Sequence, residues 1–268
     1  MNERVPGEHE PGGGWAERAP AYLASAVHAD GPSLPKVLAL ARPRPSDRCL
    51  DIGTGAGHTA ARLAPLAAEV IALDPEPAML ASARERYGNL PNLRFLQAPG
   101  HDTGLADGSV DVVTARHTLH HHRDLEATLR EVARVLRPGG RFVLVDEATP
   151  DPAVDAWFDA LERARDATHV RAYTLAEWRR MLAGAGLLWI AGDVYTRYRQ
   201  RVEDWLGLMR LGPSGEAEVR RLFRRAGSME RRLFDIEFAD GEAVRFSLPM
   251  AVALAVRAGH GDTEGAGA

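Results

Sequence analysis

Hydrophobic residues in the first half of the chain fall into short runs that alternate with amphipathic stretches. Five runs rich in aliphatic and β-branched residues predict strands, at residues 48–52, 69–73, 93–97, 110–114 and 141–145. Three amphipathic stretches between them predict helices, at residues 59–66, 76–87 and 125–136. Strands that alternate with helices through short connections are typical of a parallel sheet with helices on both faces. We therefore predict an α/β fold built on a doubly wound, mostly parallel sheet, which two further strands from the second half of the chain make a seven-stranded sheet.

The pattern changes beyond Pro150, where helical segments dominate. They are predicted at residues 153–167, 175–185, 202–211 and 216–226. Two alternating runs, 232–238 and 242–248, flank an Asp-Gly pair at residues 240–241, and this arrangement predicts a β-hairpin. We expect the helices to form a cap and the hairpin strands to extend the edge of the sheet as antiparallel additions.

One domain with an elaborated cap fits this organisation better than two domains. It would span residues 15–257, with a core at 36–147 and the cap and sheet edge at 150–257. Residues 1–14 and 258–268 are rich in Gly, Pro and charged residues and poor in apolar ones, so we expect them to be disordered tails.

Composition narrows the class of protein further. The hydrophobic and charged shares, 45% and 26%, are ordinary for a folded globular chain, and the formal net charge of −4 disfavours a nucleic-acid partner. The single cysteine, Cys49, cannot form an internal disulfide or a multi-cysteine metal site, which is typical of a cytoplasmic protein. The longest apolar run, residues 249–256, is far shorter than the about 20 residues that span a bilayer. Composition leaves the oligomeric state open, with a homodimer among the options.

A glycine-rich loop follows the first predicted strand in residues 49–60, CLDIGTGAGHTA. Gly53, Gly55 and Gly57 stand at alternate positions between a strand and a helix, where open α/β sheets bind ligands. The dinucleotide fingerprint requires a further glycine where this chain has His58, which disfavours a nicotinamide oxidoreductase. No lysine follows the loop, so it is not a P-loop either.

Asp74 ends the second predicted strand in the segment IALDPEPAML. A carboxylate at this place accepts hydrogen bonds from the hydroxyls of a ribose in related folds. The alternative is a helix N-cap, because an Asp-Pro pair also begins helices. Together with the glycine loop, Asp74 favours a ligand that carries a ribose.

Four segments in sequence order resemble the motifs of the class I S-adenosylmethionine-dependent methyltransferases. They are LDIGTGAGHTA at 50–60, IALDPEPAML at 71–80, DGSVDVVTARHTLHHHRD at 107–124 and EVARVLRPGGRFVLVD at 131–146. The likeness covers roughly residues 34–190 and is strongest to the type 11 domain of the ubiquinone and menaquinone C-methyltransferases. It implies a Rossmann-like methyltransferase fold, a small-molecule acceptor and S-adenosyl-L-methionine as the cofactor.

The resemblance also implies which positions contact the cofactor. They are Asp51, Gly53, Thr54, Gly55, Gly57, Asp74, Pro75, Met79, Gly100, His101 and Arg116. The chain departs from the family at the segment that usually reads Gly-Asp-Ala, because Pro99 stands where the acid binds the adenine amino group. The backbone of Gly100 and His101, or the side chain of Asp102, is left to make that contact.

Four histidines, His117, His120, His121 and His122, crowd the segment after the fourth predicted strand. Histidine titrates near neutral pH, so His120 or His121 is a candidate general base for an acceptor that must lose a proton. The alternative is a structural role in which these rings bond the backbone. Histidines adjacent in a loop cannot all face one point, so no metal is expected without ligands from elsewhere in the chain.

Each of several other side chains has two possible roles. Glu147, at the end of the fifth predicted strand, either orients a substrate or caps the following segment. His169, Arg171 and Trp178 either line a substrate pocket or, for Trp178, belong to the core. Trp15 and Tyr22 either close over the sulfonium of the cofactor or simply pack.

The predicted activity is methyl transfer from S-adenosyl-L-methionine to carbon or oxygen of a small acceptor by in-line displacement. The alternative is a cofactor-binding enzyme of the same fold that performs cyclisation or decarboxylation instead. A nucleic-acid methyltransferase is disfavoured by the net charge and by the absence of an Asn-Pro-Pro-Tyr-type motif.

Overall fold

The computed structural model describes residues 15–209 and 211–259 of the 268-residue chain. The predicted tail at residues 1–14 lies outside the described residues, as does all but the first two residues of the predicted tail at 258–268.

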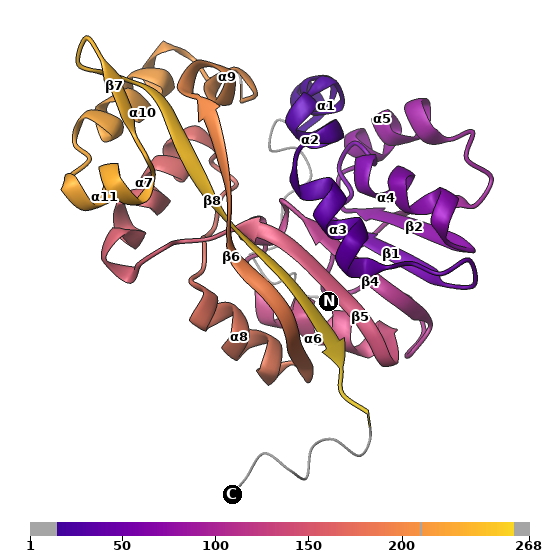
Figure 1. Cartoon of the computed structure of the whole chain (residues 1–268). Coiled ribbons are helices and arrows are strands. Elements are labelled where there is room, and N and C mark those ends of the chain that lie inside the picture. Colours follow the sequence, from indigo (N-terminus) through magenta and orange to yellow (C-terminus); the bar gives the residue numbers. More distant parts are fainter. Residues whose placement is uncertain (1–14, 210, 260–268) are drawn as a thin grey trace, which may run out of the picture.

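One mixed sheet of eight strands organises the molecule (Figure 1). The strands are β1 (Arg48–Ile52), β2 (Glu69–Asp74), β3 (Leu93–Gln97), β4 (Val110–Arg116), β5 (Leu136–Glu147), β6 (Leu187–Arg201), β7 (Glu237–Ala239) and β8 (Glu242–Arg257). Their order is β3-β2-β1-β4-β5-β8-β6, with β7 paired to β8. The first five strands are parallel, and β8 runs antiparallel between β5 and β6. The predicted doubly wound, mostly parallel sheet with antiparallel additions at its edge is confirmed, but the sheet has eight strands where seven were predicted.

Helices cover both faces of this sheet. The α-helices are α1 (Trp15–Ala24), α2 (Ala26–Asp30), α3 (Ser33–Ala41), α4 (His58–Leu63), α5 (Pro77–Tyr87), α6 (Leu125–Val135), α7 (Asp155–Arg165), α8 (Leu175–Gly184), α9 (Val202–Gly207), α10 (Pro213–Arg224) and α11 (Ser228–Leu233). Short 3-10 helices are η1 (Ala64–Leu66), η2 (Leu119–His121) and η3 (Pro152–Val154).

Alternation along the parallel strands decides which helices pack on which face. Cys49 and Val70 point to the face that α3 and α4 cover, whereas Leu50 and Ile71 point to the face of α6 and α8. Each pair consists of successive residues, and successive side chains of a strand point to opposite faces. The parallel strands are therefore buried on both sides, and their carboxyl ends form one edge where loops can build a site.

The second half of the sheet differs from the prediction in three places. Strand β6 was not predicted, residues 232 and 233 belong to α11, and β8 continues to Arg257 through the apolar run 249–256. Most of that run is buried between β5 and β6, so it lacks the apolar–polar alternation that reveals a one-sided strand. The predicted hairpin is confirmed, since Asp240 and Gly241 both have positive φ between β7 and β8.

The long strands β6 and β8 leave the main sheet and carry a second lobe made of α7, α9, α10, α11 and β7 (Figure 1). Aromatic rings fill the centre of this cap, with the Phe246 ring 4.8 Å from that of Trp205 and 5.2 Å from that of Phe223. The cap is thus a distinct aromatic core joined to the sheet by two continuous strands.

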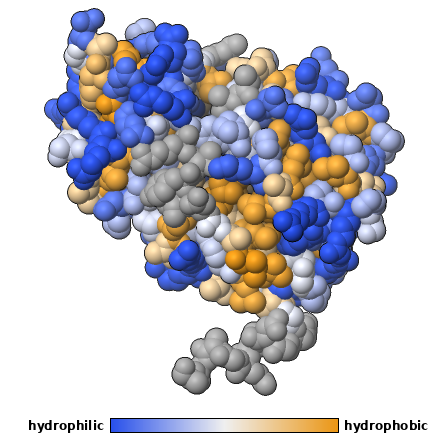
Figure 2. Space-filling model, viewed as in Figure 1, coloured by the Kyte–Doolittle hydropathy of each residue, from blue (hydrophilic) through white to orange (hydrophobic). Residues whose placement is uncertain are grey.

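Hydrophobic side chains also reach the surface, and Figure 2 shows them gathered over the lower part of the sheet. Leu188 and Ile190 of the outer strand β6 are 43% and 57% exposed. None of the described helices combines the length and the apolar character that crossing a membrane requires.

Candidate functional site

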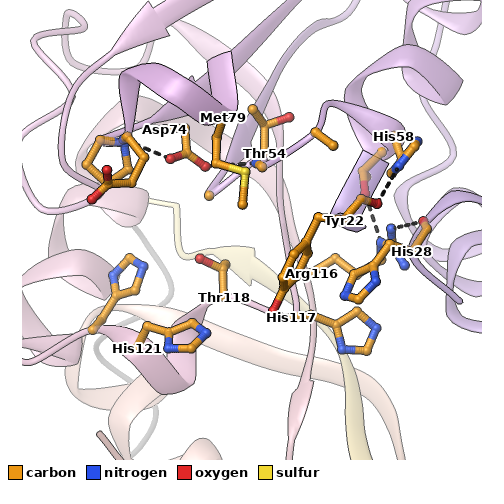
Figure 3. Close-up of a pocket in the computed structure, with 17 residues that line it drawn as sticks. Tyr22, His28, Thr54, His58, Asp74, Met79, Arg116, His117, Thr118 and His121 are labelled. Atoms are coloured by element: carbon orange, nitrogen blue, oxygen red, sulfur yellow. Dashed lines mark hydrogen bonds between the residues drawn. The ribbon is translucent and has the colours of Figure 1, made fainter. Parts of the chain in front are cut away.

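A cavity lies at the carboxyl ends of β1, β2 and β4 (Figure 3). Seven of the eleven predicted cofactor contacts line it: Gly53, Thr54, Gly55, Asp74, Pro75, Met79 and Arg116. These residues come from the glycine loop, the end of β2 with the start of α5, and the last residue of β4. The fold therefore brings residues separated by more than 60 positions to one wall of one cavity.

The glycine loop is fixed by hydrogen bonds beneath it. The buried Asp51 carboxylate accepts hydrogen bonds from the Thr54 hydroxyl at 2.7 Å and from the Thr114 hydroxyl at 2.6 Å. Gly53 has φ of 61°, and a Cβ placed there would lie 2.0 Å from the hydroxyl oxygen of Thr118. Asp51 does not line the cavity, so the structure gives it the role of ordering the loop.

Asp74 presents its carboxylate to the cavity while the backbone holds it in place. Oδ2 accepts the Gly55 N–H at 2.8 Å, and Oδ1 accepts the Glu76 N–H at 2.9 Å. Each oxygen keeps a further lone pair for a donor in the cavity. Burial, aided by the charges of Glu76 and Asp51 and opposed by these two hydrogen bonds, raises the pKa of Asp74 to about 6. The alternative role as the N-cap of α5 is wrong, because Glu76 occupies that position.

Three further predicted contacts do not line the cavity: Gly57, Gly100 and His101. Gly57 lies where α4 approaches α5, since a Cβ there would be 3.0 Å from that of Ala83. At Gly100 a Cβ would be 2.7 Å from Cε1 of His122, so this segment packs against the His122 ring, which lines the cavity.

Arg116 brings a buried positive charge to the cavity wall. Its guanidinium donates to the Thr59 hydroxyl at 2.9 Å, to the Ser33 hydroxyl at 3.2 Å and to the carbonyl oxygen of His28. These acceptors carry no charge, and the side chain is only 9% exposed. A buried cation among neutral acceptors favours an anionic group in the adjoining space.

The N-terminal helices supply two residues of the cavity: Tyr22, which was a candidate to close over the sulfonium, and His28, which no sequence motif indicated. Tyr22 and His28 line the cavity together with His117, which follows β4 in a left-handed conformation with φ of 55° (Figure 3). Burial lowers the pKa of His28 to about 3 and holds that of His117 well below its usual range, so both rings are neutral. No spacing along the sequence links α1 and α2 to the end of β4, so only the fold reveals this contact.

A second cavity adjoins the first and shares four of its residues: Tyr22, His28, His117 and His121. The cap completes it with residues such as Arg165, Trp205 and Leu208, and its volume is about 60 Å³. The two cavities thus meet at one aromatic and histidine-rich boundary.

The two histidines predicted as candidate bases occupy different positions. His121 lines both cavities, and its Nδ1 lies 3.1 Å from the Thr168 hydroxyl. His120 lines only the second cavity, and its Nδ1 bonds the Asp146 carboxylate at 2.5 Å. Burial alone would lower the pKa of His120, but the charges of Glu147 and Asp146 outweigh it and raise this pKa to about 10. The surroundings of His120 therefore favour positive charge.

The structure also places the other residues for which the sequence left two possible roles. Trp178 is fully buried in the core beside α6, its ring 5.4 Å from that of Tyr173, so a place in the substrate pocket is wrong. Arg171 pairs with Asp155 and Glu177, away from both cavities. The Trp15 side chain lies outside the described part of the molecule.

Glu147 and His169 are the last two of these candidates, and they lie side by side. Glu147 lines the second cavity, as the substrate-orienting reading requires. His169 is buried against it, with its Nδ1 3.7 Å from the Glu147 carboxylate.

Known proteins share both the sequence and the fold. A family model described as a methyltransferase domain matches residues 50–144. The uncharacterized methyltransferase YcgJ of Bacillus subtilis is 38% identical over 172 residues, which are 63% of this chain and 68% of YcgJ. The crystal structure of YcgJ superposes with a TM-score of 0.80 and 31% identity over 85% of this chain and 98% of that one.

Two other relatives extend the range. Demethylmenaquinone methyltransferase of Beutenbergia cavernae is 36% identical over 107 residues, 40% of this chain and 43% of that protein. The cyclase SpnF shares the fold with a TM-score of 0.60 at 16% identity, over 84% of this chain and 80% of that one. By its motifs, its sheet and its similarity to YcgJ, the chain belongs to the class I S-adenosylmethionine-dependent methyltransferases. The enzyme class expected from the four motifs is thereby confirmed.

Proposed function

We propose that this methyltransferase binds S-adenosyl-L-methionine in the cavity of Figure 3 and transfers its methyl group to carbon or oxygen of a small-molecule acceptor. The observation that carries the proposal is the Asp74 carboxylate. It is buried, aligned by two backbone N–H groups and open to the cavity at the carboxyl end of β2. A ribose offers two adjacent hydroxyl donors that match its two oxygens.

The remaining cavity residues suit the other parts of the cofactor. The backbone of Gly53 and Gly55 and the Thr54 side chain face the space where the methionine portion would lie, and Arg116 supplies a charge for its carboxylate. Pro75 and Met79 would flank the adenosine. When bound, the cofactor supplies an activated methyl group on a sulfonium centre.

The second cavity is our candidate for the acceptor site. Tyr22 lies at its boundary with the first cavity, where an aromatic face attracts a sulfonium cation. Burial raises the pKa of Tyr22 to about 12, so its ring stays a neutral phenol at physiological pH. Alignment of donor and acceptor for in-line displacement contributes up to about 7–11 kcal/mol in favourable cases. A demethylmenaquinone methyltransferase among the relatives supports a small-molecule acceptor.

A general base is needed only if the acceptor loses a proton. Of the two histidines proposed for this role, His121 is better placed because it lines both cavities, whereas His120 lies deeper and bonds Asp146. We infer that His121 or His117 receives a proton from a hydroxyl or acidic carbon, and that His120 is not this base.

Calorimetric titration with S-adenosylhomocysteine tests the role of Asp74. We expect Asp74→Ala to bind at least about 100-fold more weakly, because two hydrogen bonds to a charged acceptor are lost at about 1.5–3 kcal/mol each. Asp74→Asn keeps one acceptor oxygen and should bind at least about 10-fold more weakly. Glu85→Gln, an exposed carboxylate of the adjoining helix α5, is the matched control and should bind as wild type. Unchanged affinity in both Asp74 variants would remove the assignment.

The fate of the methyl group separates methyl transfer from cyclisation or decarboxylation. With S-adenosyl-L-methionine labelled in its methyl group and a pool of small metabolites, we expect one label in product for each S-adenosylhomocysteine formed. Conversion of a metabolite while the label stays on the cofactor would support the non-methylating alternative.

A further inference from the structure

Three buried side chains from distant parts of the chain face one another beside the second cavity. His120 comes from η2, Glu147 ends β5, and His169 lies between α7 and α8. One ligand atom from each lies within 4.8 Å of the others. The Glu147 carboxylate is 3.9 Å from Nε2 of His120 and 3.7 Å from Nδ1 of His169. All three residues were named from the sequence, as candidates unrelated to one another.

The outward nitrogen of each imidazole is fixed by a second carboxylate. His120 donates from Nδ1 to Asp146 at 2.5 Å, and His169 donates from Nε2 to Asp159 at 3.1 Å. Asp146 is anchored in turn by the N–H groups of Thr118 and Leu119. Histidines that bind metals nearly always donate their other N–H to such a partner, which sets the tautomer and the ring orientation.

The atoms that face inward lack hydrogen bonds. Oε2 of Glu147 and Nδ1 of His169 are buried and have no hydrogen-bond partner within the described ranges 15–209 and 211–259. The separations of 3.7 and 3.9 Å are too long for hydrogen bonds. They are close to the about 3.4 Å between ligand atoms that each lie near 2.1 Å from one tetrahedral ion. A single ion between the three groups would bond both of these unpartnered atoms once the ligand atoms, which lie within 4.8 Å of one another, move closer together.

Charge around the cluster also favours a cation. Five carboxylates in this region are at most 9% exposed: Asp146, Glu147, Asp159, Glu162 and Asp166. Arg165 pairs with Glu162, and Arg18 pairs with Asp166. Glu147 has no arginine within ion-pair distance among the described contacts, and its neighbours are the two imidazoles. A buried carboxyl group keeps its charge only when it is paired or bound to a metal.

We propose that Nε2 of His120, Nδ1 of His169 and the Glu147 carboxylate bind one divalent transition-metal ion. Two imidazoles and one carboxylate suit Zn²⁺ or Fe²⁺, whereas Mg²⁺ and Ca²⁺ prefer oxygen ligands alone. The expectation of no metal assumed that all ligands would come from one loop, and here the fold supplies two of the three from other segments.

The metal would leave at least one coordination position for another ligand. His120 and Glu147 both line the second cavity, so that position opens toward the proposed acceptor site. An oxygen of the acceptor would occupy it, which makes a hydroxyl, phenol or carboxylate the favoured acceptor class. This role rests on the proposed function, whereas metal binding itself does not.

The test is calorimetric titration of Zn²⁺ into the metal-stripped, untagged full chain, without cofactor. We expect one ion per chain with a dissociation constant of about 1 µM or tighter. Glu147→Gln and His169→Ala should each weaken binding at least 100-fold, and Asp159→Asn should weaken it about 10- to 100-fold through the ring of His169. His122→Ala, two residues from His120, is the matched histidine control and should bind Zn²⁺ as wild type. The wild-type chain should not bind Mg²⁺ at this site.

Substitution of Co²⁺ gives a second measurement that needs no variant. A four- or five-coordinate site predicts intense visible absorption bands at one equivalent, and a weak spectrum like that of hydrated Co²⁺ would overturn the proposal. Zn²⁺ binding that is absent in the wild type, or unchanged in Glu147→Gln, would overturn it as well. Thermal unfolding of each metal-free variant shows whether it folds. S-adenosylhomocysteine titration is separate, so failure of the metal site and failure of the cofactor site are distinguishable.

Discussion

The proposed cofactor end of the site, at the first cavity, and the proposed acceptor end, at the second, are built in different ways. At the cofactor end, a loop of contiguous residues follows β1, and the carboxylate of Asp74 ends the neighbouring strand. At the acceptor end, side chains converge from η2, the end of β5 and the segment after α7. Backbone geometry at a strand end can be recognised in a short motif, whereas convergence of distant side chains depends on the whole fold.

The two ends also differ in what stabilises them. The glycine loop rests on the Asp51 hydrogen bonds within the parallel sheet. The cap owes its shape to an aromatic core in which Phe246 of β8 contacts Trp205 and Phe223. If this division is correct, damage to one end should leave the other largely intact.

The largest expected effect is that of Phe246→Ala. Removing a fully buried aromatic side chain should lower the free energy of unfolding by about 3–5 kcal/mol. Chemical denaturation measures this loss, and titration under native conditions should still give wild-type affinity for S-adenosylhomocysteine. Weaker cofactor binding by the folded variant would show that the cap and the cofactor end are not separable.

Gly53→Ala and Gly55→Ala sharpen the comparison within the loop. Both glycines have positive φ, but only at Gly53 does a Cβ overlap another group, the Thr118 hydroxyl. We expect Gly53→Ala to lower the free energy of unfolding by about 3 kcal/mol and Gly55→Ala by about 1–2 kcal/mol. Equal losses would contradict the close approach of Thr118.

The affinity for S-adenosylhomocysteine should depend on pH through Asp74. Its pKa of about 6 in the free protein means that the carboxyl becomes neutral below that pH and loses its power to accept two hydroxyl donors. Affinity should be constant above about pH 7 and fall about tenfold for each pH unit well below 6. Calorimetry across pH 5–8 measures this, and Asp74→Asn, the control, should show no such slope.

The smallest expected effect on stability is that of the capping box of α8, whose residues line neither cavity. The Thr174 hydroxyl accepts the Glu177 N–H at 3.2 Å, and the Glu177 carboxylate accepts the Thr174 N–H at 2.8 Å. Thr174→Ala should cost about 1 kcal/mol in unfolding free energy, and Thr174→Ser should cost less. A change in affinity for S-adenosylhomocysteine would contradict the separation of α8 from the site.

Sequence patterns revealed much of this architecture where function lies in local backbone. The parallel strands, the glycine loop and Asp74 were predicted because each depends on a short stretch with a fixed geometry. Strand β6 was missed because its neighbours in the sheet are distant in sequence and its residues do not alternate clearly. Gly100 and His101 were predicted to contact the cofactor; they do not line the cavity, and Gly100 lies against the ring of His122, which does, so their contact with the cofactor stays a prediction.

The acceptor end was harder to predict for a physical reason. His169 lies 49 positions after His120. The two segments are held together by hydrogen bonds from the backbone N–H groups of Val170 and Arg171 to the His120 carbonyl oxygen. The composition of these segments does not encode that pairing. Their convergence with Glu147 became visible only in the folded chain.

The most direct test of the central claim is a paired calorimetric titration of the wild-type chain with S-adenosylhomocysteine and with NAD. If the cavity between the glycine loop and Asp74 is the cofactor site, S-adenosylhomocysteine should bind at one site per chain and NAD should not compete with it. Saturable binding of NAD in preference to S-adenosylhomocysteine would contradict the account.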